Sequence, residues 1–213
     1  AWFEKRGMAL RRALAVVGIA LAAFVAVYTG MLLMAAENVP LWNTPLLPVL
    51  FSVSAFDTGV ALVELVAVLA SKKDPLAPKA RTLMERIVVV LVLLEGVVMA
   101  AFLASMLGGD AQTAIGATAA SSASLLVSGG LAVCFWGMVV ACGLALPLVM
   151  AVAGLVLHGR AKKKPGAGQH GSGVLMAIGA AGALVGGCEL RFLILAAGVH
   201  ADVVAETVRG LIG

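Results

Sequence analysis

Long apolar stretches alternate with short polar connections along almost the whole chain. A bilayer hydrocarbon core of roughly 30 Å takes about 20 residues of α-helix. Five of the stretches reach that length. We therefore predict an all-α protein, a polytopic transmembrane helical bundle that forms one domain over residues 1–213. The predicted spans are 13–36, 46–70, 87–107, 131–157 and 173–198.

The basic residues lie in alternate connections, and this pattern predicts the orientation of the chain. They are Lys5, Arg6, Arg11 and Arg12 before the first span, Lys72, Lys73, Lys79, Arg81 and Arg86 before the third, and Arg160, Lys162, Lys163 and Lys164 before the fifth. The connections 37–45 and 108–130 contain neither lysine nor arginine. Because basic loops stay on the cytoplasmic side, we expect a cytoplasmic N-terminus and an external C-terminus. The expected location is the cell inner (cytoplasmic) membrane, with several passes.

The segment 111–130 is rich in small residues and does not fit a further span. If it crossed the membrane, the last span and the basic connection before it would be inverted. We predict an interfacial or partly re-entrant helix here, with Gly129 and Gly130 as its hinge. In the fourth span, Pro147 predicts a kink, because proline removes one helical hydrogen bond.

The composition agrees with a membrane protein and argues against two other classes. Hydrophobic residues make up 62% of the chain and charged residues 12%, far from the averages of soluble domains. The net charge of +4 comes from basic residues that flank the spans, so we expect no nucleic-acid binding. Cys134, Cys142 and Cys188 lie within spans and lack the spacing of metal ligands. No two histidines can face each other across the bundle, so we expect no haem, iron–sulfur cluster or other metal in this chain.

Acidic residues inside the predicted spans are candidates for function, because a charge at membrane depth costs several kcal/mol. Asp57 and Glu64 lie on the second span and Glu95 on the third. Asp57 and Glu64, seven residues apart, face within about 20° of one direction and differ by about 10 Å in height. Glu64 and Glu95 could relay protons, or could hold helices together through hydrogen bonds. Asp57, nearer the predicted outer mouth, is better placed to contact a ligand.

Three further polar side chains lie at membrane depth. Arg191, on the fifth span, keeps its charge and therefore needs a partner. Glu189 points roughly 160° away from it around the helix, so a carboxylate on another span, a ligand or a lipid is the expected partner. Glu189 and Arg191 are thus candidates for a structural ion pair or a ligand contact. Tyr28 lies below the headgroup belt, where its hydroxyl is expected to need a hydrogen-bond partner.

The order of several short motifs is similar to that of one family of membrane subunits. The motifs are Tyr28-Thr29-Gly30, Pro40-Leu41-Trp42-Asn43, Leu50-Phe51-Ser52-Val53-Ser54-Ala55 with Thr58-Gly59, Phe135-Trp136-Gly137 with Gly143-Leu144-Ala145-Leu146-Pro147, and Gly186-Gly187 with Leu190-Arg191-Phe192 and Ala197-Gly198. The series resembles the membrane subunit family of polysulfide reductase, also called NrfD-like, and matches its later helices. The resemblance extends over about residues 13–200.

The resemblance implies a quinone-interacting anchor in a respiratory oxidoreductase complex. It implies electron transfer between menaquinone or another quinone and an iron–sulfur, ferredoxin-like subunit, with a molybdopterin catalytic subunit as a further partner. Such a chain is not expected to be catalytic alone. Tyr28 matches the tyrosine of the family's Tyr-x-Gly helix and would bond a quinone oxygen. Asn43 and Asp57 lie at the same membrane face in the predicted topology and are the other candidates for the quinone site.

Two other functions are compatible with the sequence. An ion-coupled transporter would also use intramembrane carboxyls, although no internal repeat supports it. A purely structural membrane anchor would need no quinone site. Solute uptake by the chain alone would indicate the transporter, and bound quinone would exclude the purely structural anchor.

Overall fold

The computed structural model of the protein describes residues 2–70, 78–109, 113–161 and 169–200. Helices account for almost all of these residues, and none of the described residues forms a strand. The helices are α1 (Trp2–Met34), α2 (Leu46–Ala70), α3 (Pro78–Leu107), α4 (Ala114–Val127), α5 (Ala132–Cys134), a π-helix (Phe135–Ala145), α6 (Leu146–Ala161) and α7 (Gln169–Ala196). The predicted all-α fold is confirmed.

Among the described residues, five helical segments are long and apolar enough to cross a membrane, in agreement with the five predicted spans. The second predicted span, 46–70, matches α2 at both ends. The third begins at Pro78 rather than at residue 87, so α3 includes part of the basic sequence that had been assigned to a connection. Because of this earlier start, Glu85 lies on α3 and is buried in the bundle.

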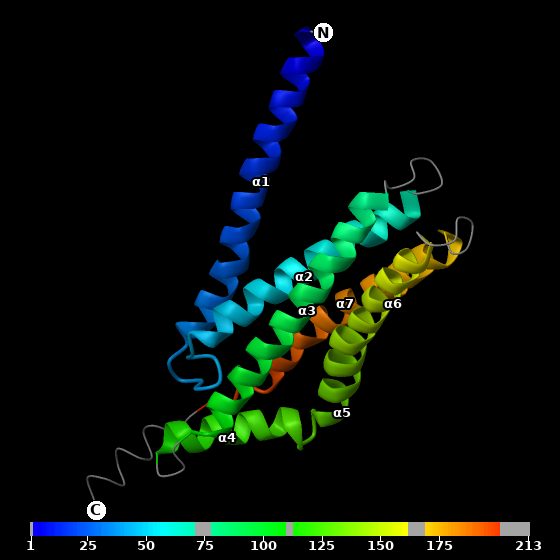
Figure 1. Cartoon of the computed structure of the whole chain (residues 1–213). Helices are drawn as coiled ribbons and strands as arrows, with labels where there is room; N and C mark the ends of the chain where they lie inside the picture. Colours follow the sequence, from blue (N-terminus) through cyan, green and yellow to red (C-terminus); the bar gives the residue numbers. More distant parts are fainter. Residues whose placement is uncertain (1, 71–77, 110–112, 162–168, 201–213) are drawn as a thin grey trace, which may run out of the picture.

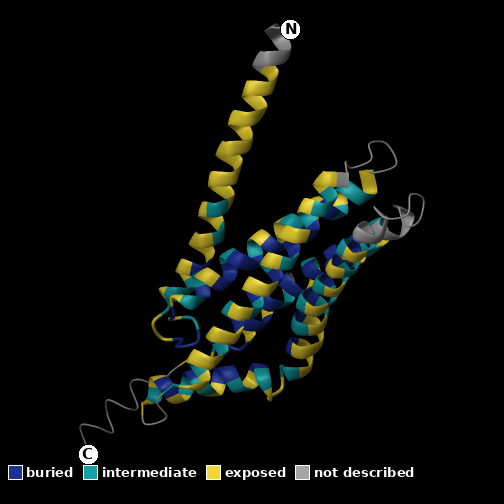
Figure 2. Ribbon diagram, in the orientation of Figure 1, coloured by how far each residue is buried: buried dark blue, intermediate teal, exposed yellow. Residues whose placement is uncertain are grey.

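Four of the five long segments form a bundle, and α7 is at its centre (Figure 1). α7 packs against α2, the π-helix and α6, while α3 packs against α2 and α6. α1 packs against α2 and leans away from the other helices, so most of its surface is exposed (Figure 2). Its buried contact is at Gly30, which lies against Pro48 of α2. The exposed side chains of α1 are mainly apolar, as suits a helix that faces lipid.

The two ends of the bundle differ in what they contain (Figure 1). The end of α2 and the start of α3 lie at the same end as the start of α1; we call this the inner end. The 35–45 connection, α4 and the end of α7 lie at the opposite, outer end. α4 runs across that end, in the region where an interfacial helix was predicted. Thr113 caps α4 by accepting a hydrogen bond from the Gly116 N–H at 3.1 Å.

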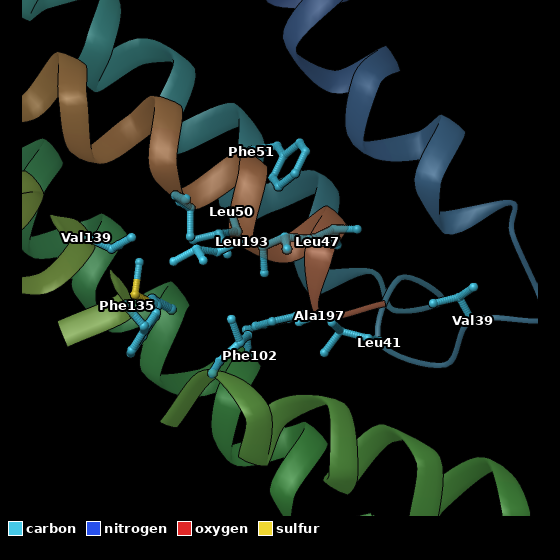
Figure 3. Packing of buried hydrophobic residues seen from close by; sticks show 14 residues of the cluster. Val39, Leu41, Leu47, Leu50, Phe51, Phe102, Phe135, Val139, Leu193 and Ala197 are labelled. Carbon is cyan, nitrogen blue, oxygen red and sulfur yellow. The ribbon is translucent and has the colours of Figure 1, made fainter. Parts of the chain in front are cut away.

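The largest hydrophobic cluster lies toward the outer end and fixes the positions of α2, α3 and α7 (Figure 3). Its buried members include Leu47, Leu50, Phe51, Phe102, Leu193 and Ala197. Trp42, from the 35–45 connection, donates its indole N–H to the carbonyl oxygen of Ile194 at 2.9 Å. This part-buried bond ties the connection to the last turn of α7, so packing and a hydrogen bond together close the outer end of the bundle.

The fourth span departs from α-helical geometry before Pro147 rather than at it. The N–H of Leu146 bonds to the carbonyl of Ala141, five residues back, as in the wider ring of a π-helix. The π-helix lies against α7, where Gly143 and Gly186 bring the two backbones into contact. A Cβ atom on either glycine would overlap the other backbone, so this approach requires glycine on both sides.

The positions of the two ends lead to a topology prediction. Fusion of a reporter after Lys164 should place it in the cytoplasm, and fusion after residue 205 should place it outside, because the basic connections favour the cytoplasmic side. Paired fusions to green fluorescent protein and alkaline phosphatase would measure this. If both positions report the same side of the membrane, the five-span arrangement is wrong.

Candidate functional site

Among the described residues, four carboxyl side chains lie inside the bundle, each no more than 4% exposed. Asp57 and Glu64 come from α2, and Glu85 and Glu95 come from α3. Because α2 and α3 run in opposite directions, Glu64 and Glu85 lie toward the inner end and Asp57 and Glu95 lie near mid-depth. The structure thus buries three of the acidic residues that the sequence predicted, Asp57, Glu64 and Glu95, and adds a fourth, Glu85.

The sequence does not single out Glu85, because the basic residues around it are typical of a connection. A periodic signal was nevertheless present in the sequence. Buried residues of α3 recur at intervals of three and four, as on one face of a helix. They are Glu85, Val88, Val92, Glu95, Met99 and Phe102. Extending this face one turn back from Val88 would have placed Glu85 inside the bundle.

A small cavity joins three of these carboxyls. It has a volume of about 10 Å³ and is lined by Asp57, Glu64 and Glu85, together with apolar residues of α6 and α7 such as Met150 and Met176. One oxygen of Asp57, Oδ1, and one of Glu64, Oε1, have no hydrogen-bond partner among the described residues. Buried polar atoms normally have a partner, so this cavity is a place where a small polar ligand would be stabilised.

Glu95 belongs to a second group of polar side chains, closer to the outer end. Its neighbours include Ser54, Asp57 and Arg191. Ser54 and Arg191 both approach Gly187 of α7, where a larger residue would fill the space between them. The acidic residues of α2 and α3 are therefore continuous with the one arginine of the described part of α7.

Arg191 lies at the wall of an open cleft between α1, α2 and α7. The cleft has a volume of about 500 Å³ and is lined by Leu21, Ala22, Val25, Ala26, Thr29, Phe51, Ala55 and Arg191. The guanidinium donates a hydrogen bond from Nη1 to the carbonyl oxygen of Gly187 at 2.6 Å and lies over the Phe51 ring, 5.9 Å from its centroid. These two contacts hold a cation beside a largely apolar space.

No described residues form a metal site. Within residues 2–70, 78–109, 113–161 and 169–200, no three side chains of His, Cys, Asp or Glu come close enough together to hold a metal ion. The described cysteines, Cys134, Cys142 and Cys188, are free thiols.

Comparison with known proteins identifies the family. The family model described as NrfD, polysulphide reductase, matches residues 2–202. This protein belongs to the NrfD family. It is 36% identical over 189 residues to the C subunit of polysulfide reductase from Wolinella succinogenes, and the match covers 89% of the present sequence and 54% of that subunit. It is 30% identical over 190 residues to protein NrfD of Escherichia coli, with the same two coverages, 89% and 54%.

The chain spans about half the length of these curated NrfD relatives. No solved structure matches it significantly. The family match confirms the resemblance inferred from the motif order, and the five apolar helices agree with a membrane protein of this family. The assignment of individual residues rests on the geometry of this NrfD chain itself.

The three residues predicted for a quinone site occupy different environments in this NrfD chain. Tyr28 is 49% exposed on α1 and stacks on Phe24, with the ring centroids 6.0 Å apart. Asn43 is exposed in the 35–45 connection at the outer end, and Asp57 is buried in the bundle. Tyr28 follows Leu21 of the cleft by seven residues, which places it within about 20° of the same direction on α1. Tyr28 therefore lies beside the cleft, and Asp57 lies deeper in the bundle.

The contacts of Arg191 are with residues other than Glu189. Both residues are half-buried on α7, and Arg191 turns toward Phe51 and the carbonyl of Gly187. Thr29, for which no separate role was predicted, lines the cleft, and its hydroxyl donates to the carbonyl oxygen of Val25 at 2.8 Å. Its position on the cleft depends on the angle between α1 and α2, which the local sequence does not encode.

Proposed function

We propose that this chain is the quinone-interacting, integral membrane subunit of a respiratory oxidoreductase complex. In this proposal it passes electrons between menaquinone or another membrane quinone and an iron–sulfur partner subunit. A molybdopterin subunit would perform the catalytic reaction, and the complex would lie in the cell inner (cytoplasmic) membrane. The family match and the five apolar helices support the proposal.

The observation that carries the proposal is Arg191 at the wall of the apolar cleft. A volume of about 500 Å³ lies within the usual range for small-molecule sites, roughly 300–1,000 Å³. A quinone has a flat ring, two acceptor oxygens and an apolar tail. The cleft offers apolar walls for the ring and tail, and the guanidinium offers N–H donors for an oxygen. The residues present therefore fit a quinone.

The neighbouring polar residues would complete this site. When bound, a quinone, which is lipid-soluble, would carry two electrons and two protons. Tyr28, beside the cleft, would donate a hydrogen bond to an oxygen of the ring, and Asn43 would contact the ligand from the outer end. Asp57, six residues after Phe51 on α2, would accept or hold a proton, because its Oδ1 has no partner among the described residues.

Glu64 and Glu95 are proposed to move protons between the cleft and the interior of the bundle. Glu95 has both Asp57 and Arg191 as electrostatic neighbours, and Glu64 has Asp57 as one. Arg191 is proposed as a ligand contact, and its charge also acts on the Glu95 carboxyl. Quinone-linked turnover of a Glu95→Gln variant, compared with its level of assembly, would separate proton delivery from a purely structural role.

Tyr28→Phe provides a test of the proposed function. The substitution keeps the ring and its stacking on Phe24 but removes the hydroxyl. A hydrogen bond contributes about 1 kcal/mol net, and more to a charged oxygen. Since each 1.4 kcal/mol is about tenfold in rate, quinone-linked turnover should fall several-fold to tens-fold. The measurement is the ratio of quinone-linked to dye-linked turnover in the complex purified through this chain.

The dye-linked rate serves as the internal control, because artificial dyes bypass the membrane site. It should stay near the wild-type value. An unchanged ratio of quinone-linked to dye-linked turnover would show that Tyr28 is not part of the quinone site. Purification without any redox subunit or quinone would contradict the proposed function as a whole.

A further inference from the structure

The inner end of the bundle contains a carboxyl that the proposed quinone chemistry does not use. Glu85 lies two turns into α3 and is 1% exposed. α6 passes directly over it at Gly154, where an added Cβ would collide with the Glu85 carboxyl. The absence of a side chain at Gly154 leaves room for the Glu85 carboxyl beneath α6, inside the bundle.

The cavity beside Glu85 has the size and chemistry of a hydration site. Its volume of about 10 Å³ is close to the roughly 10–15 Å³ at which a cavity holds a single water. Two carboxyl oxygens in its lining, Oδ1 of Asp57 and Oε1 of Glu64, have no hydrogen-bond partner among the described residues, and both side chains are more than nine-tenths buried. A water with two or more such partners is stabilised, whereas an apolar ligand would leave them unsatisfied.

The charged groups that line this cavity come from two of the described helices. α2 contributes Asp57 and Glu64, and α3 contributes Glu85. The α6 and α7 residues of the lining are uncharged: Pro147, Met150, Ala151, Leu175, Met176, Gly179, Ala180 and Ala183. Arg81 of α3 is a cation that acts on Glu64 electrostatically. A proton inside the cavity would therefore be shared among three carboxyls, with a cation nearby.

Arg81 also connects this group to the inner end. It lies one turn before Glu85, is half-buried, and donates its Nε–H to the sulfur of Met176 at 3.0 Å. Lys79, two residues earlier, is exposed. Six residues of helix, about 9 Å along the axis, separate the Glu85 backbone from this exposed lysine.

We propose that the cavity is a hydration site and that Glu85 is the entry point through which it exchanges protons with the inner end of the bundle. The carboxylic acid of Glu85 gives its proton to the bound water, and the water passes one of its own protons to the carboxylate of Glu64. Glu85 then takes a proton from solvent near Arg81. Atoms and charge balance at each step. This proposal goes beyond the proposed function, since it does not depend on what the cleft binds.

Hydrogen–deuterium exchange followed by infrared spectroscopy tests the proposal on the full chain in lipid bilayers, without added quinone. Glu64→Gln identifies the carboxylic acid band of Glu64 by its loss. On transfer to deuterated buffer, this band should shift about tenfold more slowly, or slower still, in Glu85→Gln than in the wild type. Glu37→Gln is the matched control, because it makes the same change at an exposed site in the outer connection. In Glu37→Gln, the Glu64 band should shift at the wild-type rate.

A wild-type exchange rate in Glu85→Gln would overturn the proposal, as would the absence of a Glu64 carboxylic acid band at every pH tested. If Glu85→Gln does not fold, the Glu85→Asp variant provides the test. It keeps a carboxylic acid but shortens the side chain by one methylene, which moves the acid away from the cavity. Slower exchange in Glu85→Asp supports the entry role, and an unchanged rate overturns it. If the wild type shows no quinone-linked turnover but exchange slows in Glu85→Gln as expected, only the proposed function is contradicted.

Discussion

Arg191→Gln is expected to lower quinone-linked turnover about ten- to a hundredfold while dye-linked turnover stays near the wild-type value. Hydrogen bonds to charged groups contribute about 1.5–3 kcal/mol, and each 1.4 kcal/mol is about tenfold in rate. Glutamine keeps an N–H donor but loses the charge and the planar group that lies over Phe51. The ratio of the two rates in the same preparation is the measurement.

Two variants control this experiment. Arg191→Lys keeps the charge without the planar fork of donors, so it should recover only part of the lost activity. Arg86→Gln removes an arginine charge from an exposed position of α3 at the inner end and should leave the ratio unchanged. If Arg191→Gln retains the wild-type ratio, the cleft is not the quinone site.

Gly186→Ala should lower the thermal unfolding midpoint by about 5–10 °C. Its new Cβ would overlap the backbone of Gly143, and overpacking of this kind costs about 1–3 kcal/mol or more. For a chain of about 150–250 residues, each kcal/mol shifts the midpoint by roughly 2–4 °C. The measurement is a thermal unfolding curve of the purified protein in detergent.

Gly137→Ala is the matched control for Gly186→Ala. Gly137 lies on the same π-helix that Gly186 contacts, and an added Cβ there meets no atom within 4 Å. Its midpoint should be unchanged or slightly higher, since alanine favours a helix over glycine. Equal midpoints for the two variants would contradict the close contact of the π-helix with α7.

The sequence predicted the spans well because length and hydropathy alone decide them. α2 matched its predicted range of 46–70, where prolines before and near its start mark the boundary. α3 was predicted too short, because Lys79, Arg81 and Arg86 suggested a loop although they extend the helix beyond its apolar part. The π-helix was not predicted either. Pro147 indicated an irregularity, but whether a helix kinks or widens depends on what it packs against.

The sequence predicted only part of the candidate site. Asp57, Glu64, Glu95 and Arg191 were recognised because ionisable residues are costly at membrane depth. Their actual neighbours depend on helix packing, which brings Arg191 of α7 against Phe51 of α2. The cleft itself could not be predicted, because it is formed by the angle at which α1 leans away from α2 (Figure 1).

Photoaffinity labelling with a quinone analogue tests the central claim most directly. The purified protein in lipid would be illuminated with a photoreactive quinone, digested, and studied by mass spectrometry. We expect attachment within 21–29 of α1 and close to Arg191 of α7, and loss of this labelling with an excess of natural quinone. Labelling confined to other helices, or labelling that natural quinone does not displace, would contradict the assignment of the cleft as the quinone site.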